Sequence, residues 1–146
     1  MEEKGSLQNL WVKTAKGSPM NTVESVSIKA RKGIVGNADQ RGRRQITILS
    51  VQDWLEVESI LGHTLDPKIR RANLFIDGIG LPNTKGRTLQ VGTARIKIRG
   101  ETTPCRWMDA ADDGLKAALS PDWRGGAYGV ALNDATITVG DSVYWT

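Results

Sequence analysis

The sequence contains one cysteine and one histidine, and these counts exclude several kinds of site. A single thiol cannot form an intramolecular disulfide, which excludes the disulfide-stabilised scaffolds of small secreted proteins. It also excludes a zinc or iron–sulfur site built from several cysteines of one chain. Because His63 is the only histidine, a two-histidine metal site is excluded, and a Cys-His catalytic pair would have to combine Cys105 with His63.

Long hydrophobic runs are also missing. No apolar stretch approaches the roughly 20 residues that a membrane-spanning helix needs. The N-terminal residues Met-Glu-Glu-Lys-Gly do not resemble the basic and apolar regions of a secretory signal. We therefore expect a cytoplasmic protein that does not associate with membranes.

The composition is that of a globular protein. Hydrophobic residues make up 39% of the 146 residues and charged residues 25%, so we expect a single domain over residues 1–146. The net charge of +4 permits binding to an anion, to a phosphate-bearing cofactor or to nucleic acid, but it selects none of them. A solvated basic surface without a ligand is the alternative.

Short segments of alternating or β-rich residues predict strands. Turn residues separate these segments, and no regular alternation of strands with helices indicates a parallel sheet. We therefore predict a mainly β protein, with a closed or nearly closed, mostly antiparallel β-barrel and one or two short helices. The predicted strands cover residues 7–13, 23–30, 45–50, the apolar part of 69–78, 88–91, 94–99, 127–132, 135–139 and 142–145.

The clearest helix is predicted over residues 51–61, where apolar residues recur at helical spacing. Ser50 is the expected N-cap, with Asp53 favouring the positive helix end, and Gly62 is expected to end the helix. A weaker helix is predicted over residues 112–119.

Cys105 is the first candidate for chemistry. Residues 94–99 alternate apolar and basic side chains, and Gly100 interrupts this pattern, so Cys105 is expected in a loop beyond a strand end. A thiolate can ligate molybdenum, copper or zinc, or carry sulfur as a persulfide. Arg106 could favour the thiolate. The alternative is a small buried side chain without a chemical role.

Two arginine-containing motifs are candidates for ligand binding. The first is Arg70-Arg71-Ala-Asn73. In a strand, Arg71 and Asn73 would share one face and hold one ligand together, or the cluster is a solvated strand start. Arg124 precedes Gly125 and Gly126, which allow a ligand to approach the backbone; a loose turn is the alternative.

The basic, glycine-rich stretch at residues 31–44 has neither the phosphate-binding loop spacing nor a G-x-G-x-x-G motif. Its glycine amides and arginines could bind an anion, or it is a flexible connection.

These motifs, in this order, resemble the MOSC domain found at the C-terminus of molybdenum cofactor sulfurases. The resemblance covers the chain from Leu7 to Trp145. Its motifs are Arg71-Ala-Asn73-Leu-Phe-Ile-Asp-Gly78, Leu89-Gln-Val-Gly92, Pro104-Cys105, Arg124-Gly-Gly126 and Val139-Gly-Asp-Ser-Val143.

The resemblance implies a β-barrel that binds the molybdenum cofactor (molybdopterin). Cys105 would be the catalytic residue, either as a sulfur carrier or as a molybdenum ligand. Arg71 and Asn73 would hold the pterin or its phosphate, and Arg124, Gly125 and Gly126 would help to bind it.

An electron-donor or sulfur-donor protein would be the partner. One alternative is a molybdenum-dependent reductase of N-hydroxylated compounds. Another is a non-enzymatic basic barrel that binds nucleic acid through residues 31–44, although no aromatic side chains accompany this stretch.

Three departures from larger relatives accompany the resemblance. The chain shows no aminotransferase-like domain, so we expect that it does not mobilise sulfur from cysteine itself. It also shows no extra N-terminal β-rich domain like that of amidoxime-reducing proteins. The stretch at residues 36–39 differs from the family's usual Gly-Asp-Arg/His pattern.

Overall fold

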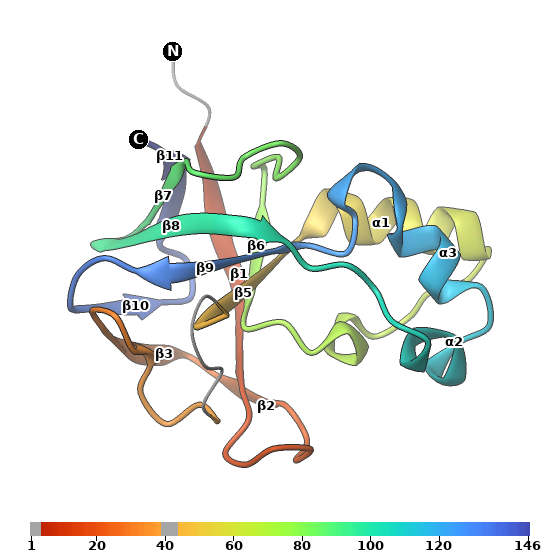
Figure 1. Ribbon diagram of the computed structural model, residues 1–146, viewed down its shortest axis with the longest axis horizontal. Coiled ribbons are helices and arrows are strands. Elements are labelled where there is room, and N and C mark those ends of the chain that lie inside the picture. Colours follow the sequence, from red (N-terminus) through yellow and green to blue (C-terminus); the bar gives the residue numbers. More distant parts are fainter. Residues whose placement is uncertain (1–3, 39–43) are drawn as a thin grey trace.

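The computed structural model describes residues 4–38 and 44–146, and a closed barrel of seven strands forms its body (Figure 1). Neighbouring strands pair in the order β11-β7-β8-β9-β5-β6-β1, and pairing between β11 and β1 closes the ring. The predicted mainly β barrel is confirmed. Its strands are β1 (Lys4–Val12), β5 (Ile46–Ser50), β6 (Leu74–Asp77), β7 (Thr88–Val91), β8 (Ala94–Glu101), β9 (Ala127–Ala131) and β11 (Ser142–Trp145).

Four further strands lie outside the ring. β2 (Asn21–Val23) pairs with β1, and a separate three-stranded sheet has the order β10-β3-β4. This sheet contains β3 (Ser25–Lys29), β4 (Gly33–Ile34) and β10 (Ala135–Thr138). Its apolar side chains Val26, Ile28 and Ile137 are buried in the same core as the barrel strands.

One strand pair explains the position of the main helix. β5 and β6 are parallel, whereas the other described pairs are antiparallel, so the chain must cross over between them. Helix α1 (Val51–Leu61) makes this crossover. The Ser50 side chain accepts a hydrogen bond from the Asp53 amide, and Gly62 ends the helix in the left-handed conformation. Both predicted helix ends are confirmed.

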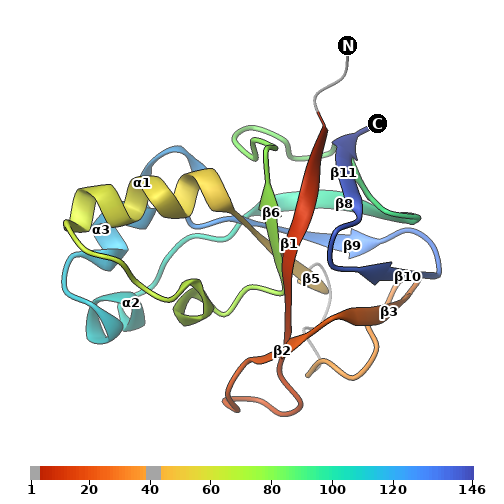
Figure 2. The ribbon, with the colours of Figure 1, turned by 180° about the vertical axis from the view of Figure 1, so that it is seen from behind.

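The other helical segments are short and lie on the same side of the barrel as α1 (Figure 2). The helix predicted over residues 112–119 begins later than expected, at Leu115, because left-handed Gly114 precedes it; it ends at Leu119 as predicted. No helix in residues 4–38 and 44–146 is long and apolar enough to cross a bilayer. These segments are η1 (Pro67–Arg70), α2 (Trp107–Ala111), α3 (Leu115–Leu119) and η2 (Pro121–Trp123).

Two apolar cores divide the molecule. The first fills the barrel with aliphatic side chains such as Leu10, Ile48 and Ile96, each at most 1% exposed. The second joins the barrel wall to the helices through aromatic and aliphatic residues. Its buried members are Trp11, Met20, Leu49, Trp54, Val57, Ala72, Phe75, Met108, Leu115, Ala118 and Leu119. At the edge of this second core, the chain segments between barrel and helices enclose the site described next.

Two local predictions need correction. Arg71 was expected in a strand, but it ends η1 in the left-handed conformation with φ 62°, and β6 begins only at Leu74. Gly100 does not end β8, which continues to Glu101 with an irregular register between residues 98 and 100. A Cβ at Gly100 would lie 2.8 Å from the Tyr128 hydroxyl, so close packing explains this glycine.

Candidate functional site

A pocket of about 380 Å³ lies beside one end of the barrel, where five chain segments meet. The segments are the end of β1, the start of β5, the connection from η1 to β6, the loop after β8 and the loop before β9. We call it the basic pocket. The described residues that line it are Lys13, Arg44, Thr47, Arg70, Arg71, Ala72, Thr102, Thr103, Pro104, Cys105 and Gly125.

Cys105 lines the basic pocket and is an exposed, free thiol. It lies in the loop between β8 and α2, and its carbonyl accepts a hydrogen bond from the Met108 amide at 3.0 Å. The predicted loop position is therefore confirmed. Arg106 is not among the lining residues, because its guanidinium lies over the Trp107 ring, 5.0 Å from the ring centroid.

Arg70 connects the two loops that form opposite parts of the pocket wall. Its Nε donates to the Gly125 carbonyl at 2.9 Å, and its Nη2 donates to the Thr102 carbonyl at 2.8 Å. Burial lowers the pKa of this guanidinium from its ordinary value, while the nearby Cys105 opposes the shift. No ion pair between described residues includes Arg70. The charge of Arg70 is thus held in the wall without a described acidic partner.

Three more cations line the pocket. Arg71 donates from Nη2 to the Ser18 carbonyl at 2.6 Å, and Arg44 lies over the Tyr128 ring, 5.1 Å from its centroid. Burial lowers the pKa of Lys13, and the neighbouring Arg71 lowers it further. None of the described lining residues is acidic. Four cations around one small volume produce a positive potential that favours an anionic ligand.

Asn73 lies in the barrel wall rather than among the described lining residues. It is fully buried; its Oδ1 accepts from the Thr47 amide and hydroxyl, both at 3.1 Å. Its Nδ2 donates to the Trp11 carbonyl at 3.1 Å. The amide therefore joins β1, β5 and the start of β6, and a direct contact between Asn73 and a ligand stays a prediction.

The residues of the Arg124-Gly125-Gly126 motif lie in different environments. Arg124 faces the end of α3, because its Nε donates to the Ala118 carbonyl at 2.7 Å. Gly125 lines the pocket, and its carbonyl also accepts from the Thr102 hydroxyl at 2.8 Å. Gly126 has a φ of 103°, and an added Cβ would lie 2.3 Å from the Ile48 carbonyl oxygen. Ligand contacts of Arg124 and Gly126 stay predictions.

Two further cations of the pocket lie in stretches that the sequence had indicated. Arg70 belongs to the predicted Arg70-Arg71-Ala-Asn73 cluster, and Arg44 ends the basic stretch 31–44 that was a candidate for anion binding. Lys13 and Thr102 were not predicted, because only the fold brings them to Cys105. Residues 39–43 of the basic stretch lie outside the described residues, and nucleic-acid binding by this stretch stays untested.

Comparisons with known proteins agree with this architecture. A family model described as the MOSC domain matches residues 17–144. A crystal structure of the YuaD protein from Bacillus subtilis is similar, with a TM-score of 0.78 and 18% identity over 96% of this chain and 94% of that one.

Crystal structures of YiiM are similar as well. YiiM from Geobacillus stearothermophilus has a TM-score of 0.73 and 16% identity over 97% of this chain and 75% of that one. YiiM from Escherichia coli has a TM-score of 0.72 and 13% identity over 100% of this chain and 70% of that one. A search of curated proteins gives no match. Since the family model covers nearly the whole sequence, the chain belongs to the MOSC domain family.

Proposed function

We propose that the basic pocket binds the molybdenum cofactor and that Cys105 acts there as a molybdenum ligand or as a sulfur carrier. One observation carries this proposal: the only thiol of the chain is exposed at a pocket lined by four cations. The MOSC domain family is associated with this cofactor, which supports the same conclusion.

The chemistry of the lining residues fits the group. A thiolate is a soft ligand suited to such a metal, and molybdopterin carries a phosphate that arginine and lysine side chains bind well. The pocket volume of about 380 Å³ falls in the range of small-molecule sites. The hydroxyls of Thr47 and Thr102 already bond within the protein, so the four cations and the Cys105 thiol are the groups suited to a ligand.

In this proposal the residues have separate tasks. Arg44, Lys13 and Arg71 attract and hold the phosphate through their charges. Arg70 positions the thiol, because its guanidinium joins the loop that carries Cys105 to the loop that carries Gly125. Cys105 presents its sulfur to the metal centre. When bound, the cofactor supplies the redox chemistry or receives the sulfur.

Two versions of the function differ in the use of Cys105. As a ligand, Cys105 would hold molybdenum, and the bound cofactor would supply the chemistry for reducing N-hydroxylated compounds with electrons from a donor protein. As a carrier, Cys105 would take a sulfane sulfur from a persulfide donor, which leaves as a thiol, and would then pass this outer sulfur on. Turnover by cofactor-loaded protein with an artificial electron donor favours the first version; loading without turnover favours the second.

The proposal is tested by producing the protein in a host that makes the cofactor and in one that does not. Molybdenum and pterin are then measured per mole of purified protein, for the wild type and for Cys105→Ser. We expect wild type from the first host to carry pterin, and in the ligand version Cys105→Ser should lose most of its molybdenum.

Protein from the second host is the control and should contain neither. If wild type from the cofactor-producing host also lacks molybdenum and pterin, the proposal is wrong.

A further inference from the structure

We propose that Cys105 takes its sulfur directly from a small anionic sulfane-sulfur donor, of which thiosulfate is the simplest. This inference rests on the sulfur-carrier version of the proposed function and names the class of donor. It assigns the basic pocket a second task besides cofactor binding, namely the selection of a doubly charged sulfur donor.

The charge of the pocket supports a donor of this class. Lys13, Arg44, Arg70 and Arg71 line it together with Cys105, and no described lining residue is acidic. Arg71 lies close enough to Lys13 for its charge to lower the pKa of Lys13. Such mutual repulsion is relieved when a dianion enters, so a dianion gains more here than a neutral donor.

The position of the thiol supports direct attack. Cys105 is exposed and its sulfur is free, so a reagent in the pocket reaches it without a change of fold. The loop that carries it is fixed at Thr102, whose carbonyl accepts from Arg70 and whose amide donates to the Gly126 carbonyl at 2.9 Å. A fixed nucleophile beside a fixed positive field favours attack on an anion that would otherwise be repelled by a thiolate.

The reaction balances without an external oxidant. The deprotonated Cys105 sulfur attacks the outer sulfur of thiosulfate and forms a new S–S bond. The S–S bond within thiosulfate breaks, and its electron pair leaves with sulfite. The products are the Cys105 persulfide and sulfite, and the cations of the pocket stabilise the charge that collects on the leaving sulfite.

The experiment uses reduced, desalted protein from a host without the cofactor, incubated with thiosulfate. Intact-mass analysis follows the addition of one sulfur atom to Cys105, and released sulfite is measured in parallel. We expect one sulfite per persulfide formed. Cys105→Ser should give neither product.

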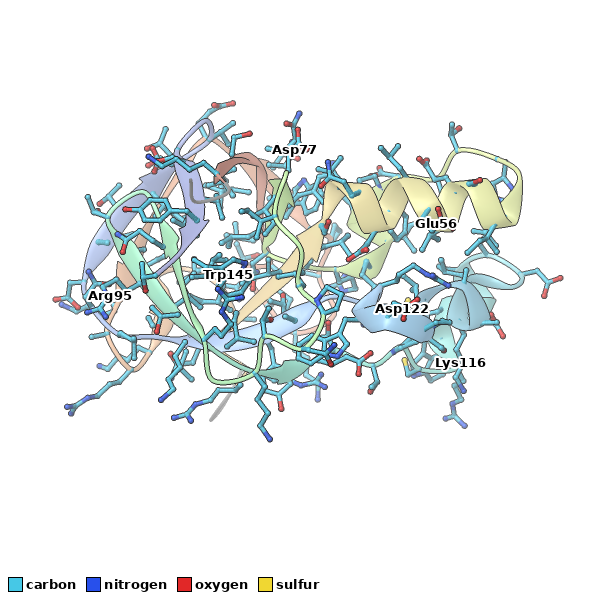
Figure 3. All side chains as sticks on the ribbon, turned by 90° about the horizontal axis from the view of Figure 1, so that it is seen from above. Glu56, Asp77, Arg95, Lys116, Asp122 and Trp145 are labelled. Carbon is cyan, nitrogen blue, oxygen red and sulfur yellow. The ribbon has the colours of Figure 1, made fainter. Side chains whose placement is uncertain are left out.

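Charge selection is tested with Lys13→Gln combined with Arg44→Gln, because neither side chain makes a described hydrogen bond that the fold needs. For each protein, the rate of persulfide formation from thiosulfate is divided by the rate of Cys105 alkylation with neutral iodoacetamide. This ratio corrects for changes in the reactivity of the thiol itself. We expect this ratio to fall about tenfold. The matched control is Arg95→Gln. Arg95 is an exposed cation at the start of β8, whereas the other end of this strand leads to Cys105 (Figure 3). The ratio of this variant should match that of the wild type.

An unmodified Cys105, modification without sulfite release, or an unchanged ratio in the double variant would each overturn this inference. Cofactor content is measured separately on protein from the cofactor-producing host. Persulfide formation without cofactor in that protein would contradict the proposed function alone, whereas bound cofactor without persulfide formation would contradict the donor inference alone.

Discussion

The barrel wall and the basic pocket treat polar side chains in opposite ways. In the wall, Asn73 is fully buried and its amide bonds with atoms of β1 and β5. In the pocket, Lys13, Arg44 and Arg71 lie near one another without a described acidic neighbour. The first arrangement stabilises the fold, because every bonded polar atom avoids a desolvation cost. The second arrangement opposes folding through mutual repulsion, which the proposed anionic ligand would relieve. Mutations in the wall should therefore lower the free energy of unfolding, whereas mutations of the pocket cations should not.

The largest expected effect is in the wall. Asn73→Ala removes the bonds to the half-buried Thr47 and to the buried Trp11 carbonyl, so these groups lose their partner. We expect a loss of about 3 kcal/mol in the free energy of unfolding, measured by urea titration. Asn21→Ala, at an exposed position of β2, is the control and should change stability by less than about 0.5 kcal/mol. Equal effects of both changes would contradict a structural role for Asn73.

Gly126→Ala tests the place where wall and pocket meet. The new Cβ would clash with the Ile48 carbonyl, in addition to the strain of a positive φ. Gly140 also has a positive φ, of 98°, but an added Cβ meets no atom within 4 Å. We expect Gly126→Ala to cost about 2 kcal/mol more than Gly140→Ala in urea titration. Equal urea midpoints for the two variants would contradict the close contact between Gly126 and β5.

Asp53 tests how far buried charge opposes folding outside the pocket. Burial raises the pKa of this carboxyl to about 6 from its ordinary 3.8, Arg124 opposes the rise, and Asp122 adds to it. Its Oδ2 is buried without a described hydrogen-bond partner. The folded protein holds this proton more tightly than the unfolded chain does. The contribution of the protonated Asp53 carboxyl to the free energy of unfolding is therefore full below about pH 4 and is lost as pH rises through about 6.

Asp53→Asn removes this pH dependence. Between pH 4 and pH 8, the difference in unfolding free energy between the variant and wild type should shift by about 1 kcal/mol in favour of the variant. This value allows for solvent screening of a partly exposed group. Urea titrations of both proteins across this range measure the difference. A difference that does not change with pH would contradict the raised pKa of Asp53.

The smallest expected effect on stability is in the pocket. Lys13→Gln removes one of the mutually repelling cations, so the free energy of unfolding should stay equal or rise by a few tenths of a kcal/mol. Thermal unfolding at low salt measures this change. A clear loss of stability would show that Lys13 stabilises the fold and would weaken the contrast with Asn73.

Local signals in the sequence predicted much of the fold. The Ser50 cap and Gly62 define α1 because capping depends on neighbouring residues alone. The hairpin of β7 and β8 follows from alternation on both sides of a turn at Gly92. Cys105 was placed correctly in a loop, although the strand before it ends at Glu101 and not at Gly100.

The pocket was harder to predict because its members are distant in the sequence. Lys13, Arg44 and Arg70 meet Cys105 only after the barrel closes. The sequence also gave no sign that the Asn73 amide bonds with Trp11, 62 residues earlier in the chain. Arg71 does line the pocket, although it reaches it from a left-handed residue at the end of η1 and not from a strand. Such pairings depend on tertiary structure and not on local pattern.

The central claim is that the cations of the basic pocket bind the molybdenum cofactor. Its most direct test is the pterin content of protein purified from a cofactor-producing host. Wild type and Arg95→Gln should carry equal amounts of pterin, whereas the Lys13→Gln and Arg44→Gln double variant should keep its fold and lose most of it. Equal pterin in all three proteins, or none in any, would contradict the claim.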